Sequence, residues 1–470
     1  MPRPHPRADV TVTPEGWLHR GDCFVRGDGI QLAVFGGIPG ERARVRLVGH
    51  KQHQDIGKFI APAGPAHPER VTPPCDRFAP CGRCPLMHIT PAAQARVQRL
   101  LVDEALAEFG VDGRCEPVRA SDRGDVLHQL GLVAGFSDRK SMRIGVRGHD
   151  GRDVTAIPEC LVVTPGIREL MSAAAFHLRE LEVWPWDGRS GTLRALLLRQ
   201  SPADGALQLT LVTARANHVL GELANRLASQ LSLLSGVVVH INEERPDGFH
   251  RDEEGGVGLS VVYGNVLMDL VEEDVRLRLS PADPFPVHPA MTRLVHDDVL
   301  AMLAPQQGDA VVELSPGNGM LTMRAARRSG WALGVGEAEV PSRHARDNAA
   351  ANSVAAEFLA GTVDEALAAA APRLHGRRPL AIARAGTRGL STAAIQNLLA
   401  TSPRRVVLLS SNPKALARNA AALVAGGLVA ERVVAWDVSP NTPFVEIGVL
   451  LTSPDRSPPV ARAPRRRTVR

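Results

Sequence analysis

The chain has 470 residues, enough for about three domains, and its 44% hydrophobic and 22% charged content is ordinary for a soluble globular protein. A net charge of +5 is a modest basic excess, which suits a polyanion such as nucleic acid without requiring one. No run approaches the roughly 18 apolar residues of a membrane helix. Six cysteines without a secretory leader indicate a reducing compartment, so we expect a cytoplasmic protein.

The first 62 residues predict a small β-barrel. Apolar and polar side chains alternate with period two, and glycine-rich turns interrupt the pattern, which is typical of four or five short strands in a barrel of the OB type. Arg42, Arg44 and Arg46 fall on alternate positions and so share one face of a strand. Such a row suits a phosphate backbone, but it is equally typical of a solvated strand face, and spacing alone does not separate the two.

A proline- and glycine-rich loop carries the most specific chemical signal. It places Cys75, Cys81 and Cys84 in the spacing C-x5-C-x2-C, and Cys160 supplies a fourth thiol. Thiolates gathered on a loop bind soft metals, so the pattern allows a [4Fe–4S] cluster or a four-thiolate zinc ion. In a zinc site, His88 could replace one thiol. The remaining alternative is four unrelated reduced thiols.

A helix is predicted after this loop, over residues 90–110. Thr90 and Pro91 suit its N-cap and first turn, and Gly110 ends it. Its apolar face is expected to consist of Val97, Leu100, Leu101, Ala105 and Phe109.

Short strands and helices are mixed in the middle of the chain, which predicts an α+β region. Residues 193–199 and 207–213 are expected to pair as strands, and residues 217–234 to form a helix. Residues 245–258 are charged and glycine-rich, so we expect an exposed loop there.

The last third alternates short apolar runs with helical segments. This alternation is typical of a parallel sheet that is covered on both faces. Two final strands, at 432–437 and 444–451, have a short link and are expected to be antiparallel, which completes the pattern of a class I methyltransferase domain. The earlier strands are expected at 310–314, 331–335, 380–383 and 404–410, and the helices at 320–328, 341–352, 392–400 and 413–425.

A glycine loop follows the first strand of this domain. In Glu313-Leu-Ser-Pro-Gly-Asn-Gly, Gly317 and Gly319 would let the backbone approach a ligand at the carboxyl edge of the sheet. An acidic side chain after the second strand normally holds ribose hydroxyls, and Gly336 and Glu337 compete for that position. The alternative is a plain strand-to-helix turn.

Together these segments resemble the RNA uracil-5-methyltransferase family, whose members act on ribosomal and transfer RNA with S-adenosylmethionine. The resemblance covers nearly the whole chain and is most specific in the cysteine pattern and in Ser-Asn-Pro-Lys-Ala-Leu-Ala-Arg at 411–418. It implies a TRAM-like OB barrel at 1–62, a cluster loop and α+β RNA-facing domain at 63–280, a Rossmann-like class I methyltransferase domain at 281–455, and a basic tail at 456–470.

The resemblance also implies the ligands. In this family four thiolates hold a [4Fe–4S] cluster, which favours that cluster over zinc at Cys75, Cys81, Cys84 and Cys160. S-adenosylmethionine would bind at the glycine loop, and the residues that correspond to its site are Glu313, Gly317, Gly319 and Glu337. The implied partner is ribosomal or transfer RNA, and we expect a monomer without a membrane partner.

The reaction centre departs from the family pattern. In the family a cysteine thiolate adds to C6 of a flipped-out uracil, and a carboxylate then removes the C5 proton. Glu446 matches that carboxylate, and the alternative is a carboxylate retained for structure near the start of a strand. The nucleophile position holds Ser411. A serine hydroxyl has essentially no alkoxide form near neutrality, whereas ordinary cysteine is a few per cent thiolate. The family's Asp-Pro-Pro-Arg segment reads Arg-Ala-Gly-Thr at 384–387, and its glutamine is replaced by Pro286.

The sequence therefore predicts an RNA-binding member of this family in which methyl transfer is absent or severely impaired. One alternative is an active methyltransferase with another nucleophile or target atom. Cys23 and Cys115 are the only spare thiols; both precede the methyltransferase domain, and we expect them to pack as small hydrophobic side chains. Another alternative is an iron–sulfur scaffold or redox sensor that does not contact nucleic acid.

Overall fold

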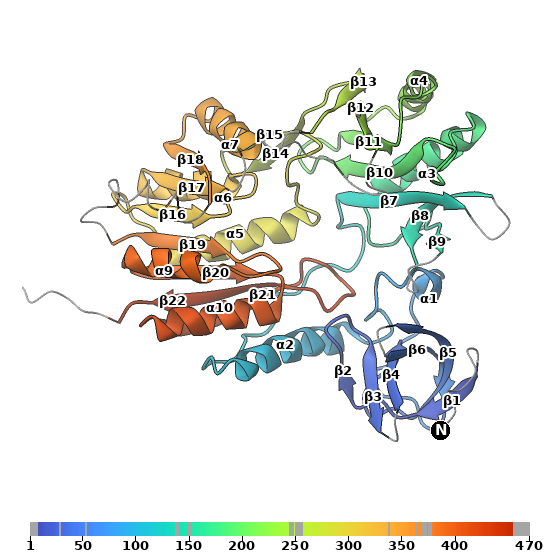
Figure 1. The fold of residues 1–470 in the computed structure, drawn as a ribbon, viewed down its shortest axis with the longest axis horizontal. Helices are drawn as coiled ribbons and strands as arrows, with labels where there is room; N and C mark the ends of the chain where they lie inside the picture. Colours follow the sequence, from blue (N-terminus) through green and yellow to red (C-terminus); the bar gives the residue numbers. More distant parts are fainter. Residues whose placement is uncertain are drawn as a thin grey trace, which may run out of the picture.

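The computed structural model describes residues 8–454 apart from 28–29, 52–53, 137–140, 149–152, 244–248, 250–256, 337–338, 363–364, 366, 368–373 and 375–377. Its described strands form a six-stranded sheet, a seven-stranded central sheet, a two-stranded ribbon and a seven-stranded C-terminal sheet (Figure 1). Three predictions fall outside the described residues: Glu337, the tail at 456–470 and most of the loop at 245–258.

The N-terminal sheet curls into a small barrel, drawn in blue in Figure 1, with its strands in the order β1-β5-β6-β4-β3-β2. The alternation is confirmed, since Arg44 and Arg46 on β5, and Arg42 just before it, are exposed between buried neighbours. The core of the barrel contains Cys23, Leu32, Val34, Ala43, Val45 and Leu47. The strands are β1 (Asp9–Val12), β2 (Gly16–Trp17), β3 (Cys23–Gly27), β4 (Ile30–Phe35), β5 (Ala43–Lys51) and β6 (Gln54–Pro62).

A short helix α1 (Phe78–Cys81) lies in the cysteine loop, and the predicted long helix follows as α2 (Pro91–Glu108). The Thr90 hydroxyl caps α2 by accepting a hydrogen bond from the Ala93 amide at 3.3 Å. The expected apolar face is wrong at Leu100, which is 43% exposed. The reason is that α2 packs against two bodies: its first turns contact the cysteine loop and its last turns the C-terminal sheet, so the buried face rotates along the helix.

The central sheet has the order β13-β12-β11-β10-β7-β8-β9, with α3 (Pro165–Glu180) and α4 (Leu220–Gln230) packed against it. The predicted pair is confirmed as the antiparallel strands β10 and β11. The helix expected over 217–234 is shorter because Leu231 is extended and leads into β12. The strands are β7 (Gln129–Phe136), β8 (Met142–Arg147), β9 (Val154–Thr155), β10 (Leu193–Gln200), β11 (Leu207–Thr213), β12 (Leu234–Ile241) and β13 (Ser260–Gly264), and the ribbon is β14 (Met268–Glu272) and β15 (Val275–Leu279).

The C-terminal sheet confirms the predicted α/β class. Its order is β18-β17-β16-β19-β20-β22-β21, the first five strands are parallel, and β22 is antiparallel to both of its neighbours. Only the edge strand β18 was not predicted. The strands are β16 (Val311–Leu314), β17 (Ala332–Gly336), β18 (Ala356–Ala360), β19 (Leu380–Arg384), β20 (Arg405–Ser410), β21 (Val429–Trp436) and β22 (Glu446–Thr452).

Helices cover both faces of this sheet, as the alternation predicts. On one face α5 and α6 pack into the core, and on the other α2, α9 and α10 do so. The sequence analysis missed α5, which mixes histidine and aspartate with its apolar residues. The helices are α5 (Pro289–Leu303), α6 (Met320–Ser329), α7 (Glu339–Ala351), α9 (Thr392–Ala400) and α10 (Pro413–Ala425).

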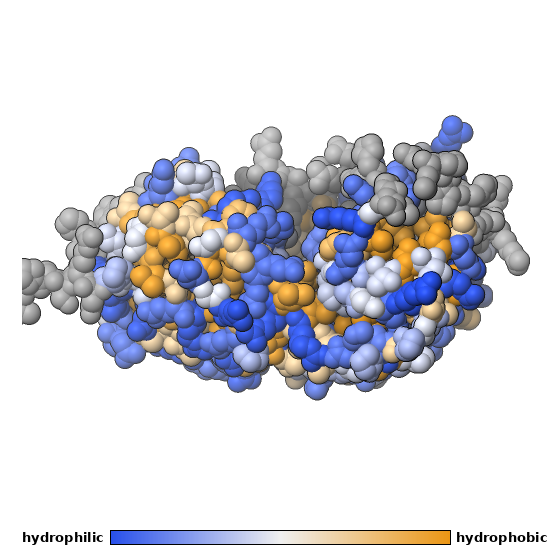
Figure 2. All heavy atoms as spheres, turned by 90° about the horizontal axis from the view of Figure 1, so that it is seen from below, coloured by the Kyte–Doolittle hydropathy of each residue, from blue (hydrophilic) through white to orange (hydrophobic). Residues whose placement is uncertain are grey.

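Figure 2 shows the molecule from below, where hydrophilic side chains surround separate hydrophobic patches. Among the described helices, none has the length and apolar composition needed to cross a membrane.

Candidate functional site

The carboxyl ends of β16, β19 and β20 form one edge of the C-terminal sheet. Leu314 pairs with Ala383 across β16 and β19, and Arg384 with Leu409 across β19 and β20. On the other side of β20, Ser410 pairs with Ile447 of the antiparallel strand β22. Ser411 directly follows β20 and Glu446 is the first residue of the antiparallel strand β22, so both residues lie at this edge.

The turn that carries Ser411 is held by hydrogen bonds on both sides. The Ser410 hydroxyl donates to the carbonyl oxygen of Gly386 at 2.7 Å, and the Asn412 amide side chain donates to that of Thr387 at 2.8 Å. Asn412 also caps α10 by accepting from the Lys414 amide at 3.1 Å. Ser411 is therefore exposed on a well-anchored strand-to-helix turn.

None of the six cysteines, all of which are described, can supply a thiolate at this turn. Cys23 lies in the barrel core. Cys115 precedes the methyltransferase domain in sequence but packs into the core under the C-terminal sheet. There its backbone forms an isolated β-bridge with Val433. Burial raises the pKa of Cys115 to about 12, with a further contribution from Asp103. The prediction that both spare thiols pack as small hydrophobic side chains is confirmed.

A buried ion pair occupies the start of this edge. Arg384 Nε donates to Glu313 Oε1 at 3.1 Å, and the Glu313 side chain is fully buried. The Thr322 hydroxyl donates to the other oxygen of the same carboxylate. Arg384 Nη2 also lies 3.4 Å from His296 Nε2, on the helix α5 that the sequence analysis missed. Both carboxylate oxygens of Glu313 therefore already have a hydrogen-bond partner within the protein, Arg384 for one and Thr322 for the other.

Glu446 is the second carboxylate of the edge. Burial raises its pKa, and the Arg384 guanidinium acts in the opposite direction. A carboxyl group with a raised pKa is suited to exchanging a proton closer to neutrality.

In the loop after β16, the space around Gly317 differs from the space around Gly319. Both have positive φ, +61° at Gly317 and +84° at Gly319. A Cβ added at Gly319 would lie 2.8 Å from the Phe358 ring, so packing explains that glycine. At Gly317 nothing lies within 4 Å of an added Cβ. Gly317 thus faces open space at the edge where a ligand would approach.

The four predicted metal-binding thiols come together at the central sheet. All four are partly buried against the same hydrophobic core. Burial raises the pKa of Cys84 to about 12, and the thiols of Cys160, Cys81 and Cys75 add to that increase, which places them within electrostatic reach. His88 is 1% exposed, and its Nε2–H donates to the Gly37 carbonyl oxygen at 2.8 Å. A metal-binding histidine commonly donates its other ring N–H to a backbone carbonyl in this way, so the bond does not argue against a zinc-ligand role for His88.

In the described part of the chain, no group of three or more histidine, cysteine, aspartate or glutamate side chains is arranged around a single ion position. In a [4Fe–4S] cluster each thiolate binds a different iron, so the sulfur atoms stand farther apart than the ligands of one ion. The positions of the described side chains therefore do not establish a bound metal ion, and the [4Fe–4S] cluster stays a prediction.

Hydrogen bonds join the cysteine loop to the loop that carries Glu446. The Leu86 amide donates to the Asn441 carbonyl oxygen at 3.0 Å. From α2, Gln98 Nε2 donates to Asp437 Oδ1 at 3.1 Å and to the Thr442 carbonyl oxygen at 2.9 Å. Asp437 is fully buried, and its hydrogen bond with Gln98 gives this carboxylate a structural role.

No protein-family model matches the chain. Sequence relatives nevertheless cover it almost completely. A protein of Halalkalibacterium halodurans named an uncharacterised RNA methyltransferase is 25% identical over 457 residues, 93% of this chain and 95% of that protein. The 23S rRNA (uracil(1939)-C(5))-methyltransferase RlmD of Shewanella sp. is 26% identical over 435 residues, 91% of this chain and 92% of its own.

A solved structure matches over the same extent. The tRNA (uracil-54, C5)-methyltransferase of Pyrococcus abyssi, crystallised with S-adenosyl-L-homocysteine, superposes with a TM-score of 0.73 at 19% identity, covering 94% of this chain and all of that one. The resemblance to the RNA uracil-5-methyltransferases is confirmed. The match also confirms the Rossmann-like class I methyltransferase fold.

For this uracil-5-methyltransferase relative, the structure gathers most of the predicted site residues into two places. Ser411, Glu446, Glu313 and Gly317 lie along one sheet edge, and the four cysteines lie at the central sheet. The sequence analysis missed the partner of Arg384, because Glu313 is 71 residues away and only the parallel pairing of β16 with β19 brings them together.

Proposed function

We propose that this protein binds ribosomal or transfer RNA and is a relative of the S-adenosylmethionine-dependent RNA uracil-5-methyltransferases. In this protein, methyl transfer to uracil C5 is proposed to be absent or severely impaired. One observation carries the proposal. The residue that follows β20 at the carboxyl edge, where β22 begins with Glu446, is Ser411, and the six cysteines pack into other parts of the structure. The names of the relatives support the family and the RNA partner.

The chemical argument concerns the uracil ring. C5 attacks a sulfonium methyl group only after a nucleophile has added to C6. The Ser411 hydroxyl ionises too weakly to make that addition. Glu446 retains the ability to accept a proton, but without the adduct the ring carbon has no acidic proton to release. The expected loss of rate is many orders of magnitude.

Cofactor binding at the glycine loop is proposed to be weak. Gly317 faces open space, which favours approach of a ligand, and the superposed Pyrococcus abyssi enzyme was crystallised with S-adenosyl-L-homocysteine. Against tight binding, the Glu313 carboxylate is already paired with Arg384 and Thr322. A ligand that used Glu313 would have to displace a buried ion pair, which lowers its net affinity.

The thiol set is proposed to hold a [4Fe–4S] cluster through Cys75, Cys81, Cys84 and Cys160. Convergence of the four thiols on one core supports this assignment. A bound cluster supplies a covalent link between the cysteine loop and the segment around Cys160. The short helix α1 helps to fix the shape of the cysteine loop, since the Phe78 amide at its start donates a hydrogen bond to the Cys75 carbonyl oxygen at 3.1 Å.

We also propose a role for each of the predicted domains. Residues 1–62 would act as a TRAM-like RNA-contacting barrel, 63–280 as the cluster loop and central RNA-facing domain, and 281–455 as the methyltransferase scaffold.

A methylation assay tests the central proposal. Anaerobically purified protein is incubated with methyl-labelled S-adenosylmethionine and bulk ribosomal and transfer RNA, and the RNA is digested to nucleosides. We expect no label in 5-methyluridine, and no covalent adduct with RNA that contains 5-fluorouracil. Label at uracil C5 would overturn the proposal. Label at another atom would favour an active enzyme with a different target, and absence of RNA binding at low salt would favour a scaffold or redox sensor.

A further inference from the structure

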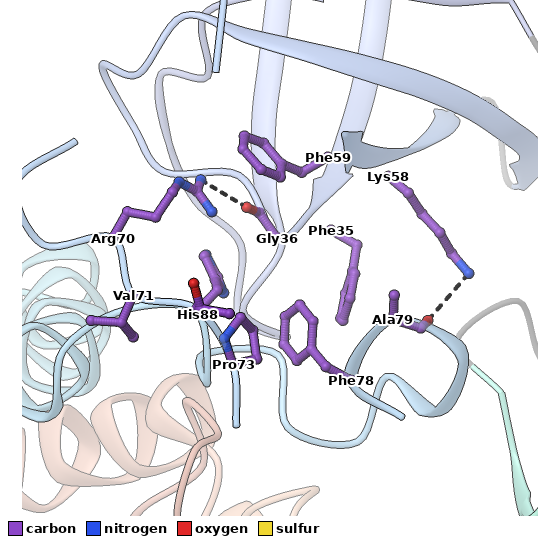
Figure 3. Close-up of a pocket in the computed structure, with 11 residues that line it drawn as sticks. Phe35, Gly36, Lys58, Phe59, Arg70, Val71, Pro73, Phe78, Ala79 and His88 are labelled. Atoms are coloured by element: carbon purple, nitrogen blue, oxygen red, sulfur yellow. Dashed lines mark hydrogen bonds between the residues drawn. The ribbon is translucent and has the colours of Figure 1, made fainter. Parts of the chain in front are cut away.

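A cavity of about 310 Å³ lies between the barrel and the cysteine loop, away from the sheet edge that carries Ser411. Figure 3 shows its walls: Phe35 and Phe59 come from the barrel, and Phe78 comes from α1 in the cysteine loop. The rings of Phe35 and Phe78 are 5.0 Å apart and tilted by 32°. The volume is at the small end of the range for ligand sites in proteins, and three phenylalanine rings and His88 are among the eleven residues that line it.

Arg70 is fixed at the edge of this cavity. Its guanidinium lies 3.8 Å from the centroid of the Phe59 ring. Arg70 Nη2 donates to the Gly36 carbonyl oxygen at 3.0 Å, and Nε donates to Glu41 Oε1 at 2.8 Å. Glu41 is 3% exposed, so the ion pair is held rigidly. The cavity therefore offers a preformed planar cation beside aromatic rings.

A basic surface leads to the cavity from the barrel. Lys58 lines the cavity and pairs with Arg46 across β5 and β6, so the two side chains share one face of the sheet. Arg42 and Arg44 continue the exposed row along β5. Lys58 Nζ donates to the Ala79 carbonyl oxygen at 3.3 Å, and within the described part of the chain it forms no ion pair, whereas Arg46 also pairs with Asp9 at 2.9 Å.

We propose that this cavity binds an unpaired nucleobase of single-stranded RNA, while the phosphates on either side of that base follow Lys58 and the arginine row of β5. Stacking on aromatic rings and on a guanidinium plane is the usual way to hold an unstacked base, and a line of cations is the usual way to hold its backbone. The inference rests on the proposed RNA binding and names a second place, besides the sheet edge, where a base leaves the stack. It also gives the arginine row a role that spacing alone could not assign.

Two probes separate the base from the backbone. One is a fluorescently labelled 12-nucleotide RNA of random sequence, and the other is the same length of backbone with abasic sites. The native chain with its cysteine loop intact, purified anaerobically, is expected to bind the first more tightly. Phe78→Ala should weaken binding of the base-bearing RNA by about 5- to 100-fold and leave the abasic RNA nearly unaffected.

Further variants guard against a folding artefact. Ala79→Trp fills the cavity while it keeps every aromatic side chain, and it should produce the same selective loss. Lys58→Ala should weaken binding of both probes. It should also reduce the slope of log affinity against log salt concentration by about 1, the value for one phosphate contact. Arg404→Ala, which removes an exposed charge just before β20 in the C-terminal sheet, is the matched control and should change neither.

The results distinguish this inference from the proposed function. Equal binding of the two probes by the unmodified protein, or an unchanged preference in both cavity variants, would overturn the nucleobase site and leave RNA binding intact. If neither probe binds at low salt, the proposed RNA binding fails and the nucleobase site fails with it.

Discussion

The thiol site and the sheet edge of this molecule differ in what they retain from the family pattern. At the central sheet, all four cysteines of the pattern are present and lie against one core. At the sheet edge, the open glycine and Glu446 are present, but Ser411 stands where the family has its nucleophilic cysteine, and Arg384 stands where the family has the Asp of Asp-Pro-Pro-Arg. The comparison teaches that one fold can keep one set of the family's residues while another set in the same chain differs.

Packing explains why the two regions tolerate change differently. The loop with Cys75, Cys81 and Cys84 is hydrogen-bonded to the loop before Glu446 through Leu86 and Asn441, so a change in the cysteine loop would disturb several elements. Ser411 is exposed on a turn that its neighbours hold in place, so its side chain can change without a cost in stability. Arg384 is accommodated because it pairs with the buried carboxylate of Glu313.

The largest effect is expected at the thiol site. Cys84→Ser should abolish the iron–sulfur content of anaerobically purified protein and lower its thermal stability, because a serine hydroxyl does not replace a thiolate ligand and the remaining thiols stay buried. Iron and sulfide analysis with thermal unfolding measures both. Cys23→Ala, which removes a barrel thiol, should leave the iron content unchanged. Full iron content in Cys84→Ser would show that this region does not bind a cluster through Cys84.

A smaller loss is expected when the ion pair at the sheet edge is broken. Arg384→Ala leaves the fully buried Glu313 without its cation and should lower the free energy of unfolding by about 3 kcal/mol. Denaturant titration measures this change. The control is Arg404→Ala, which breaks an exposed pair with Asp309 and should cost roughly 0–1 kcal/mol. Equal costs for the two variants would mean that the edge ion pair does not stabilise the fold.

The next effect is a pH dependence. Burial raises the pKa of Glu446 above its ordinary value of 4.5, so the folded state holds this proton more tightly than the unfolded state. Its contribution to stability is present below pH 4.5 and is lost as pH rises through the raised pKa. Glu446→Gln should therefore flatten the decline in unfolding free energy above that pH. Glu431→Gln, on the exposed surface of β21, should leave the slope unchanged; an unchanged slope in Glu446→Gln would contradict the prediction.

The smallest change is expected from restoring the thiol alone. Ser411→Cys should remain without detectable uracil methylation, because Arg384 and Pro286 still replace the family's acid and glutamine. The labelled-methyl assay is the measurement, and Ser410→Cys, whose side chain points to the Gly386 carbonyl, is the matched control. Methylation by Ser411→Cys would show that the missing thiol was the only defect at the edge.

Much of the fold could be predicted because local patterns are strong where a sheet is buried. The apolar runs of the C-terminal strands and the alternation of β5 follow directly from which faces meet the core. Leu100 was misassigned because α2 packs against two bodies, and α5 was missed because it mixes ionisable with apolar residues. Local periodicity does not report how many neighbours a helix has.

The residues alone determined the class of protein, the four-thiol pattern and the absence of a cysteine at position 411, since each depends only on residue type and spacing. Tertiary structure alone decided that Arg384 would neutralise Glu313, that Cys115 would be sealed under the sheet, and that Phe35, Phe59 and Phe78 would enclose a cavity beside a row of arginines. The physical reason is that charge pairing and cavities depend on which distant segments meet, and that is settled by the packing of whole sheets.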